Sequence, residues 1–212
     1  MKITWCGQSY FKIKCQNIEL IIDPYNSSIG IIPPKIKSDV VLITHNHSDH
    51  NNKDFLSNNT IVIDGPGEYE INGTFIYGKE AYHDNEDGAQ RGIITMYKIE
   101  DEKLKLAHLS DIGQKILSQD QLEFLNDVDI LLIPIGGKYT INSKEAIKLI
   151  NDIEPRVIIP MHYKIPGLKI DIETADDFIK EIGLNPEITD EYKISKNDLP
   201  ADEIKLVILK RQ

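Results

Sequence analysis

The chain has 212 residues, of which 41% are hydrophobic and 27% are charged. This composition is ordinary for a folded protein with a sizeable core, and it excludes a disordered chain. Acidic residues outnumber basic ones by 34 to 24, and the charge of −10 argues against a protein that attracts duplex nucleic acid over long distances.

The N-terminal residues, MKITWCGQSYF, lack the apolar stretch and the cleavage site of a signal peptide. No apolar segment approaches the roughly 18 residues that a membrane span needs. If residues 7–9 form a hairpin turn, Cys6 faces a residue near Tyr10 and Cys15 lies several positions away, so we expect two free thiols. These features predict a cytoplasmic protein without a membrane partner.

The first half of the chain is rich in strand patterns. Residues 2–6, 10–15 and 18–23 predict an antiparallel meander, and the continuous apolar run at 39–44 predicts a strand buried on both faces. We expect further strands at residues 60–64, 74–80, 92–100 and 103–109. Residues 65–69 and 71–73 are expected as turns.

In the second half, helices and strands alternate. Ser118 with Gln121, and Asn142 with Glu145, predict helix starts before residues 119 and 143, and Pro155 stops the second helix. Strands are predicted at residues 129–135, 156–160 and 204–209, and a third helix from Thr174. This arrangement favours one domain, residues 1–212, with two central sheets and helices outside, although it does not give the strand order.

The most informative motif follows the buried run at 39–44 and reads THNHSDH. His45 and His47 lie two positions apart, so they project to the same side of an extended segment, and Asp49 and His50 follow as the chain turns. Four strong ligands packed so closely suit two adjacent ions better than one. The alternative is a solvated polar loop without metal.

A dinuclear site needs ligands from other strand ends. His162 follows the strand at 156–160, and Asp111 stands at a strand end where a carboxylate could bridge two ions. His108 lies three positions before Asp111, so we expect it in a supporting or core position. His83, at the start of a loop, is the better third imidazole for the first ion, with a mobile surface histidine as the alternative.

The motifs THNHSDH, HD at His83, HLSD at Asp111 and PMHY at His162 resemble the metallo-β-lactamase superfamily. Together with GPGEYEING, RG at Arg91, IPIGGKYTINSKEA and IEPRVIIPMHYK, they resemble its stand-alone zinc-dependent hydrolases related to ascorbate-6-phosphate lactonase. The resemblance spans nearly the whole chain and implies an α/β fold, the four-layer αββα sandwich.

The resemblance also implies the roles of individual residues. One ion would be held by His45, His47 and His83, the other by Asp49, His50 and His162, with Asp111 bridging and Asp23 supporting the histidine loop. Relatives usually have His where this chain has Gln8 and Gly where it has Ser110, so the pocket wall and the turn beside Asp111 are expected to differ.

These residues predict a metal-dependent hydrolase that uses two divalent ions, Zn first and Mn, Fe or Ni as alternatives. A hydroxide shared by the ions would attack a small ester, lactone or phosphoester, and Asp49 would orient it and accept its proton. Redox members of the superfamily need a flavin domain, nucleic-acid processing members need clamp modules, and secreted β-lactamases need an export signal. None of these features is visible.

Five further residues are candidates for the pocket. Tyr163 and Lys164 could aid the leaving group or bind an anionic substrate, or they could be exposed side chains. The backbone of Gly136 and Gly137 could approach a ligand, or form a tight turn. Arg91 could pair with Asp84 or Glu86, or lie on the surface.

Two other functions stay open at this point. One is a metal-binding module without turnover, and the other is a small nuclease, which would need Lys and Arg around the metal site. The expected partner is a small molecule, with no membrane, nucleic acid disfavoured and a homo-oligomer left open.

Overall fold

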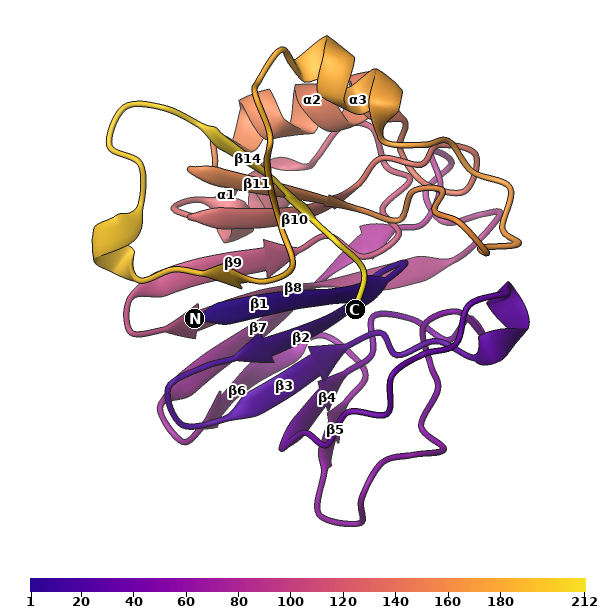
Figure 1. Ribbon diagram of the computed structural model, residues 1–212, viewed down its shortest axis with the longest axis vertical. Helices are drawn as coiled ribbons and strands as arrows, with labels where there is room; N and C mark the ends of the chain where they lie inside the picture. Colours follow the sequence, from indigo (N-terminus) through magenta and orange to yellow (C-terminus); the bar gives the residue numbers. More distant parts are fainter.

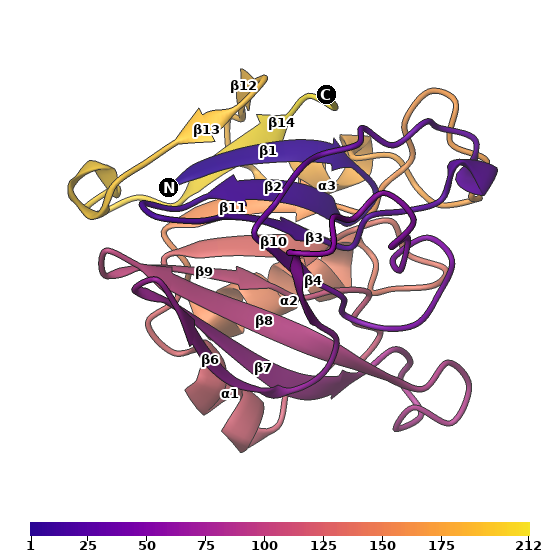
Figure 2. The ribbon, with the colours of Figure 1, turned by 90° about the horizontal axis from the view of Figure 1, so that it is seen from below.

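The computed structural model describes all 212 residues as two β-sheets packed face to face (Figures 1 and 2). The six-stranded sheet has the order β13-β1-β2-β3-β4-β5. The eight-stranded sheet has the order β12-β14-β11-β10-β9-β8-β7-β6. This architecture confirms the expected α/β sandwich.

The six-stranded sheet is built mainly from the first third of the chain. Its β1 to β3 form the predicted antiparallel meander, and β3, β4 and β5 run parallel. The strands are β1 (Lys2–Gly7), β2 (Tyr10–Lys14), β3 (Glu19–Ile22), β4 (Val40–Leu42), β5 (Ile61–Ile63) and β13 (Tyr192–Lys193).

The eight-stranded sheet is antiparallel from β6 to β9 and parallel from β9 through β10, β11 and β14 to β12. The parallel strands β10 and β11 are buried at every position, as expected for strands that are covered on both faces. The strands are β6 (Gly67–Ile71), β7 (Thr74–Tyr82), β8 (Ile93–Asp101), β9 (Leu104–His108), β10 (Ile130–Pro134), β11 (Val157–Met161), β12 (Glu187–Thr189) and β14 (Lys205–Leu209).

The α-helices are α1 (Gln119–Leu125), α2 (Ser143–Ile153) and α3 (Asp176–Ile182). Both predicted capping boxes are confirmed, at Ser118 and Asn142. The third helix begins two residues later than expected, because Ala175 is its N-cap and Thr174 instead donates to the Asp176 carboxylate. The helices lie against the eight-stranded sheet (Figure 1).

The outer face of the six-stranded sheet is covered by loops and a short 3-10 helix, η1 (Ser27–Ile29), rather than by an α-helix. Ile21, Val41 and Ile43 point to this face and pack against Ile29 and Leu168. Their chain neighbours Leu20, Ile22, Val40 and Leu42 point the other way, into the main core, because side chains alternate along a strand.

The main core contains 46 buried residues and takes side chains from both sheets. Backbone hydrogen bonds also join the sheets, since Thr95 N donates to Thr44 O and His162 N donates to Gln8 O. A single core that spans both sheets supports our proposal that residues 1–212 form one domain.

The expectation of a turn at residues 65–69 is partly wrong. Only the beginning of this segment turns, and Gly67 to Ile71 form the edge strand β6, which pairs with β7. Gly and Pro at the start of the segment are turn signals, whereas pairing with β7 decides that a strand forms. The short strands β12 and β13 were not predicted either.

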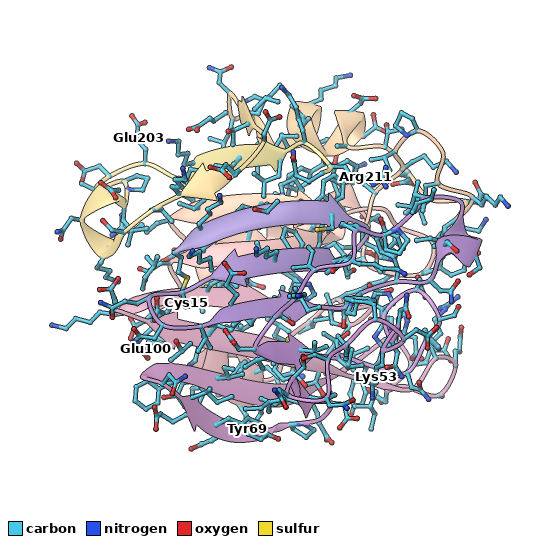
Figure 3. The ribbon with its side chains drawn as sticks, turned by 60° about the horizontal axis from the view of Figure 1, so that its bottom comes forward. Cys15, Lys53, Tyr69, Glu100, Glu203 and Arg211 are labelled. Carbon is cyan, nitrogen blue, oxygen red and sulfur yellow. The ribbon has the colours of Figure 1, made fainter.

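Cys6 and Cys15 are both buried free thiols, as expected. Figure 3 shows Cys15 near Glu100 at one end of the sheets, whereas Arg211, which donates to the Cys6 carbonyl, lies at the other end. The two sulfur atoms therefore lie at opposite ends of the β1–β2 hairpin. The structure has no helix that combines the length and apolar character needed to cross a membrane.

One edge of the sandwich collects the loops that carry polar ligands. The strands β4, β7, β9 and β11 all end there, on the right-hand side of Figure 1, so residues that follow these strands meet although they are up to 117 positions apart. This edge positions the candidate site.

Candidate functional site

Seven side chains at this edge form two adjoining groups of metal-ligand type. In each group the ligand atoms lie within 4.8 Å of one another. The groups are His45 with His47 and His83, and Asp49 with His50, Asp111 and His162. The two groups contain the residues that the resemblance assigned to the two ions, and the second also contains Asp111, the expected bridge.

The first group consists of three imidazoles from two loops. His45 and His47 follow β4 and have ring centroids 4.6 Å apart, while His83 follows β7 and lies 4.8 Å from His45 and 5.1 Å from His47. His83 is buried, and His47 is exposed at the pocket. A cation here would therefore be open to solvent on one side.

The second group is centred on the Asp111 carboxylate. Asp111 Oδ2 lies 3.0 Å from His50 Nε2, 3.0 Å from His162 Nε2 and 3.9 Å from His83 Nε2. Asp49 Oδ2 lies 3.4 Å from His50 Nε2. Asp111 thus approaches histidines of both groups, which is the position that a bridging carboxylate needs.

Asp23 orients two of these histidines from behind. Its Oδ2 accepts hydrogen bonds from His50 Nδ1 at 2.8 Å and from Thr44 Oγ1 at 2.6 Å. Because the Thr44 hydroxyl donates to Asp23, it accepts from His45 Nδ1 at 2.9 Å. Both imidazoles therefore turn their Nε2 atoms toward the site, which is the usual effect of a carboxylate behind a metal ligand.

The donor atoms fit divalent cations. His45 Nε2 and His50 Nε2 are buried and have no hydrogen-bond partner, and unsatisfied buried nitrogen is costly unless it serves a ligand. Burial lowers the pKa of His45 to about 2 and also lowers the pKa of His83, so both imidazoles are neutral. Neutral imidazole is the form that binds a metal.

The carboxylates and His50 form a charged cluster. Burial opposes ionisation of Asp111, but His162 and His50 outweigh it and hold the Asp111 pKa well below its usual value. Burial likewise disfavours charge on His50, yet Asp111, Asp49 and Asp23 raise the His50 pKa well above its usual value. Binding of a cation by His50 would therefore release a proton.

His108 has the supporting position that its spacing predicted. It is fully buried in β9, and its Nε2 bonds to the Ser9 carbonyl oxygen at 3.0 Å, so it does not reach the two groups of ligands. Ser110 N donates to His108 Nδ1 at 3.1 Å, next to Asp111.

The expected ion pair between Arg91 and Asp84 or Glu86 is wrong. The Asp84 carboxylate instead accepts four backbone N–H groups, from Glu86, Gly88, Gln90 and Arg91, at 2.7 to 3.0 Å. Asp84 thereby fixes the loop after His83. The Arg91 guanidinium makes no ion pair and lies over the Tyr139 ring, 5.5 Å from its centroid.

Tyr163 and Lys164 do not face the pocket. Tyr163 is buried and packs on Trp5 with ring centroids 4.9 Å apart. Lys164 Nζ donates to the carbonyl oxygens of Leu168 and Ile170, both at 2.7 Å. After His162 the chain turns away from the ligands, so the expected role of both residues in leaving-group or anion binding is not supported by their positions.

Gly136 and Gly137 form a tight turn, one of the two expected alternatives. A Cβ on Gly136 would lie 2.2 Å from the His162 carbonyl oxygen, so this glycine lets the loop after β10 pack directly on a candidate ligand. Gly137 has φ +61. Neither glycine lines the pocket, and α2 begins only at Ser143, so their positions do not support the other alternative, an approach to a ligand near a helix N-terminus.

Both groups contribute to the wall of a pocket of about 530 Å³, which is lined by His47, Asp49, His83, Asp111 and His162. Other parts of the wall come from Ile29, Arg91, Tyr139, Lys169, Ile170 and Asp171. Sequence reasoning did not assign Tyr139 or Lys169 to the pocket. Tyr139 lies within the quoted segment IPIGGKYTINSKEA but is not a ligand type, and Lys169 lies in a loop without a motif. The pocket has the size of a small-molecule site.

Comparison with known proteins agrees with this geometry. The family described as "Beta-lactamase superfamily domain" matches residues 2–162. The UPF0173 metal-dependent hydrolase of Methanopyrus kandleri is 29% identical, with 89% of this chain and 95% of that protein covered. The UPF0173 metal-dependent hydrolase of Methanosphaera stadtmanae is 32% identical, with 82% and 88% covered.

A solved structure from Thermotoga maritima, named for a zinc-dependent hydrolase of the metallo-β-lactamase superfamily, has 32% sequence identity and a TM-score of 0.81. The match covers 98% of this chain and 97% of that one. The chain therefore belongs to the metallo-β-lactamase superfamily, as a metal-dependent hydrolase whose fold gathers its ligand-type side chains at one edge of two sheets.

Proposed function

We propose that the protein hydrolyses a small ester, lactone or phosphoester with two divalent cations held by the seven side chains described above. The observation that carries this proposal is the pair of adjoining ligand groups, both of which contribute side chains to the wall of one pocket. Structural zinc sites are closed by four protein ligands, whereas a pocket that opens on both groups leaves room for water and substrate.

His45, His47 and His83 would hold one cation, and Asp49, His50 and His162 the other, with Asp111 between them. Zinc suits this nitrogen and oxygen set, and Mn, Fe or Ni are the alternatives. When bound, such a pair of ions lowers the pKa of a water molecule toward 7 and polarises the bond that is cleaved.

Asp49 is the proposed proton acceptor of the reaction. Burial opposes its ionisation, but the nearby charge of His50 outweighs this effect and holds the Asp49 pKa below its usual value. An ionised carboxylate at the pocket wall can orient the attacking water and take its proton.

Arg91 and Lys169 fit a substrate that carries negative charge. Both line the pocket and neither makes an ion pair, whereas Asp171 in the same wall is paired with Lys138. Two unpaired cations suit a small anion but not a long polynucleotide, which needs many phosphate contacts. We therefore favour a small, cytoplasmic substrate over the nuclease alternative.

The test is metal analysis of the purified protein by mass spectrometry, followed by a screen of lactones, esters, thioesters and phosphodiesters. We expect two ions per chain and at least one hydrolysed class. His47→Ala should lose most of that activity, because removal of a metal ligand leaves one ion incompletely held. Full activity of His47→Ala on any hit would contradict the proposal, as would a protein without bound metal.

A further inference from the structure

The turn between β1 and β2 lies directly beside the candidate metal ligands. Gly7 pairs with Tyr10, so Gln8 and Ser9 form a two-residue turn. Both residues are completely buried, which is unusual for the tip of a hairpin with polar side chains. Neither residue belongs to the groups of metal ligands.

Each turn residue donates a hydrogen bond to a different carboxylate. Gln8 Nε2 donates to Asp49 Oδ2 at 3.3 Å, and Ser9 Oγ donates to Asp111 Oδ1 at 3.1 Å. An ionised carboxylate only accepts hydrogen bonds, so the Gln8 amide must present its nitrogen to Asp49. The turn thus contacts both carboxylates that we propose as metal ligands.

The backbone of the turn is fixed to the same site. Gln8 O accepts from His162 N at 3.2 Å and from Trp5 Nε1 at 2.8 Å. Ser9 O accepts from His108 Nε2, and His108 Nδ1 accepts from Ser110 N, one residue before Asp111. The turn is therefore held rigidly on both sides while it contacts the carboxylates.

Gln8 is also an energetically unfavourable residue at this position. Its φ of 54 lies in the left-handed region, where glycine is favoured, and its buried Oε1 has no hydrogen-bond partner. Such costs are tolerated where a functional site requires them. The left-handed backbone and the unpartnered Oε1 both belong to Gln8, the residue whose amide nitrogen contacts Asp49.

From these contacts we propose that Gln8 and Ser9 position the Asp49 and Asp111 carboxylates for cation binding, with Gln8 controlling the group of Asp49, His50 and His162. The inference rests on the proposed dinuclear site. A fixed carboxylate loses less conformational freedom when it binds an ion, and residues that hold metal ligands contribute about 10- to 100-fold to metal affinity.

The experiment is a titration of the metal-free protein with Co²⁺, followed by absorption, for wild type and Gln8→Met. Methionine has a similar length to glutamine but no N–H donor. We expect one of the two binding steps to weaken about 10- to 100-fold while the other is unchanged. Gln8→His, which restores an N–H donor, should bind close to wild type. Gln16→Met, a change in the exposed turn after β2, is the matched control.

Urea unfolding of the metal-free variants separates positioning from folding. Equal weakening of both steps, or weakening that Gln8→His does not reverse, would assign Gln8 a merely structural role and overturn the inference. Unchanged Co²⁺ affinity in Gln8→Met would overturn it as well, while the dinuclear site would stand. A wild-type protein that binds fewer than two Co²⁺ ions would refute the dinuclear site itself and the inference with it.

Discussion

Four non-glycine residues at the site have a left-handed backbone: Gln8, Asp23, Ser110 and His162, with φ between 51 and 55. Each follows a strand that ends at the site edge. A left-handed residue turns the chain sharply, so the chain leaves the sheet at the site edge instead of continuing the strand. Ser110 gives a physical reason for the glycine that the resemblance leads us to expect at its position, because glycine adopts this conformation without strain.

Glycines at two other positions let loops pack on the candidate ligands. A Cβ on Gly113 would lie 2.4 Å from the His83 carbonyl oxygen, and a Cβ on Gly136 would lie 2.2 Å from the His162 carbonyl oxygen. Real Cβ atoms do not come so close, so any side chain here must displace a histidine loop.

We expect Gly136→Ala to lower the free energy of unfolding by about 1–3 kcal/mol, the usual range for overpacking. It should also weaken metal binding, because the displaced backbone carries His162. Urea unfolding and a metal titration measure the two effects. Gly65→Ala is the control, since no atom lies within 4 Å of its Cβ, and equal behaviour of the two variants would contradict the argument.

At the scale of elements, α2 illustrates a feature that is encoded locally. The Asn142 side chain accepts from Glu145 N at 3.1 Å, and the Glu145 carboxylate accepts from Asn142 N at 3.0 Å. Both residues stand within one helical turn, so the sequence alone predicted this start. In contrast, β6 depends on pairing with β7, and its own residues carry turn signals.

Asn142→Ala should reduce the free energy of unfolding by about 1 kcal/mol, because backbone N–H groups at the start of α2 lose their acceptor. Chemical denaturation measures the change. Lys148→Ala, at an exposed position in the same helix, should stay within about 0.5 kcal/mol of wild type. A cap variant as stable as the Lys148 variant would show that the capping box contributes nothing.

For the whole molecule, the candidate ligands link two sheets. Asp49 and His50 follow β4 of the six-stranded sheet, whereas Asp111 and His162 follow β9 and β11 of the eight-stranded sheet. A cation bound by this group would therefore join the two sheets at one edge. Metal should then stabilise the packing of the sandwich as well as provide reactivity.

We expect Zn²⁺ to raise the Tm of the chelator-treated protein. At a free ion concentration 100 times the Kd, binding to the native state contributes about 2.7 kcal/mol. Thermal unfolding with Zn²⁺ or with EDTA measures the difference. A variant with both His47→Ala and His162→Ala should show little difference, and a wild-type Tm insensitive to Zn²⁺ would contradict the link between the sheets.

The sequence by itself determined the features that depend on neighbours in the chain. These features are the H-x-H-x-D-H motif after a buried strand, the candidate ligand residues at later strand ends, and both capping boxes. Each depends only on residues within a short segment of the chain. Side chains alternate along a strand, and residues three apart tend to point to opposite faces. This spacing predicted that Asp111 faces the candidate ligands and that His108 does not.

Only the tertiary structure decided which distant groups meet. It placed Arg91 on Tyr139, packed Tyr163 on Trp5, and brought Gln8 and Ser9 beside the Asp49 and Asp111 carboxylates. Hydrogen-bond partners as distant in the chain as Ser9 and Asp111, 102 positions apart, are brought together by the packing of the two sheets, which no local sequence pattern predicts.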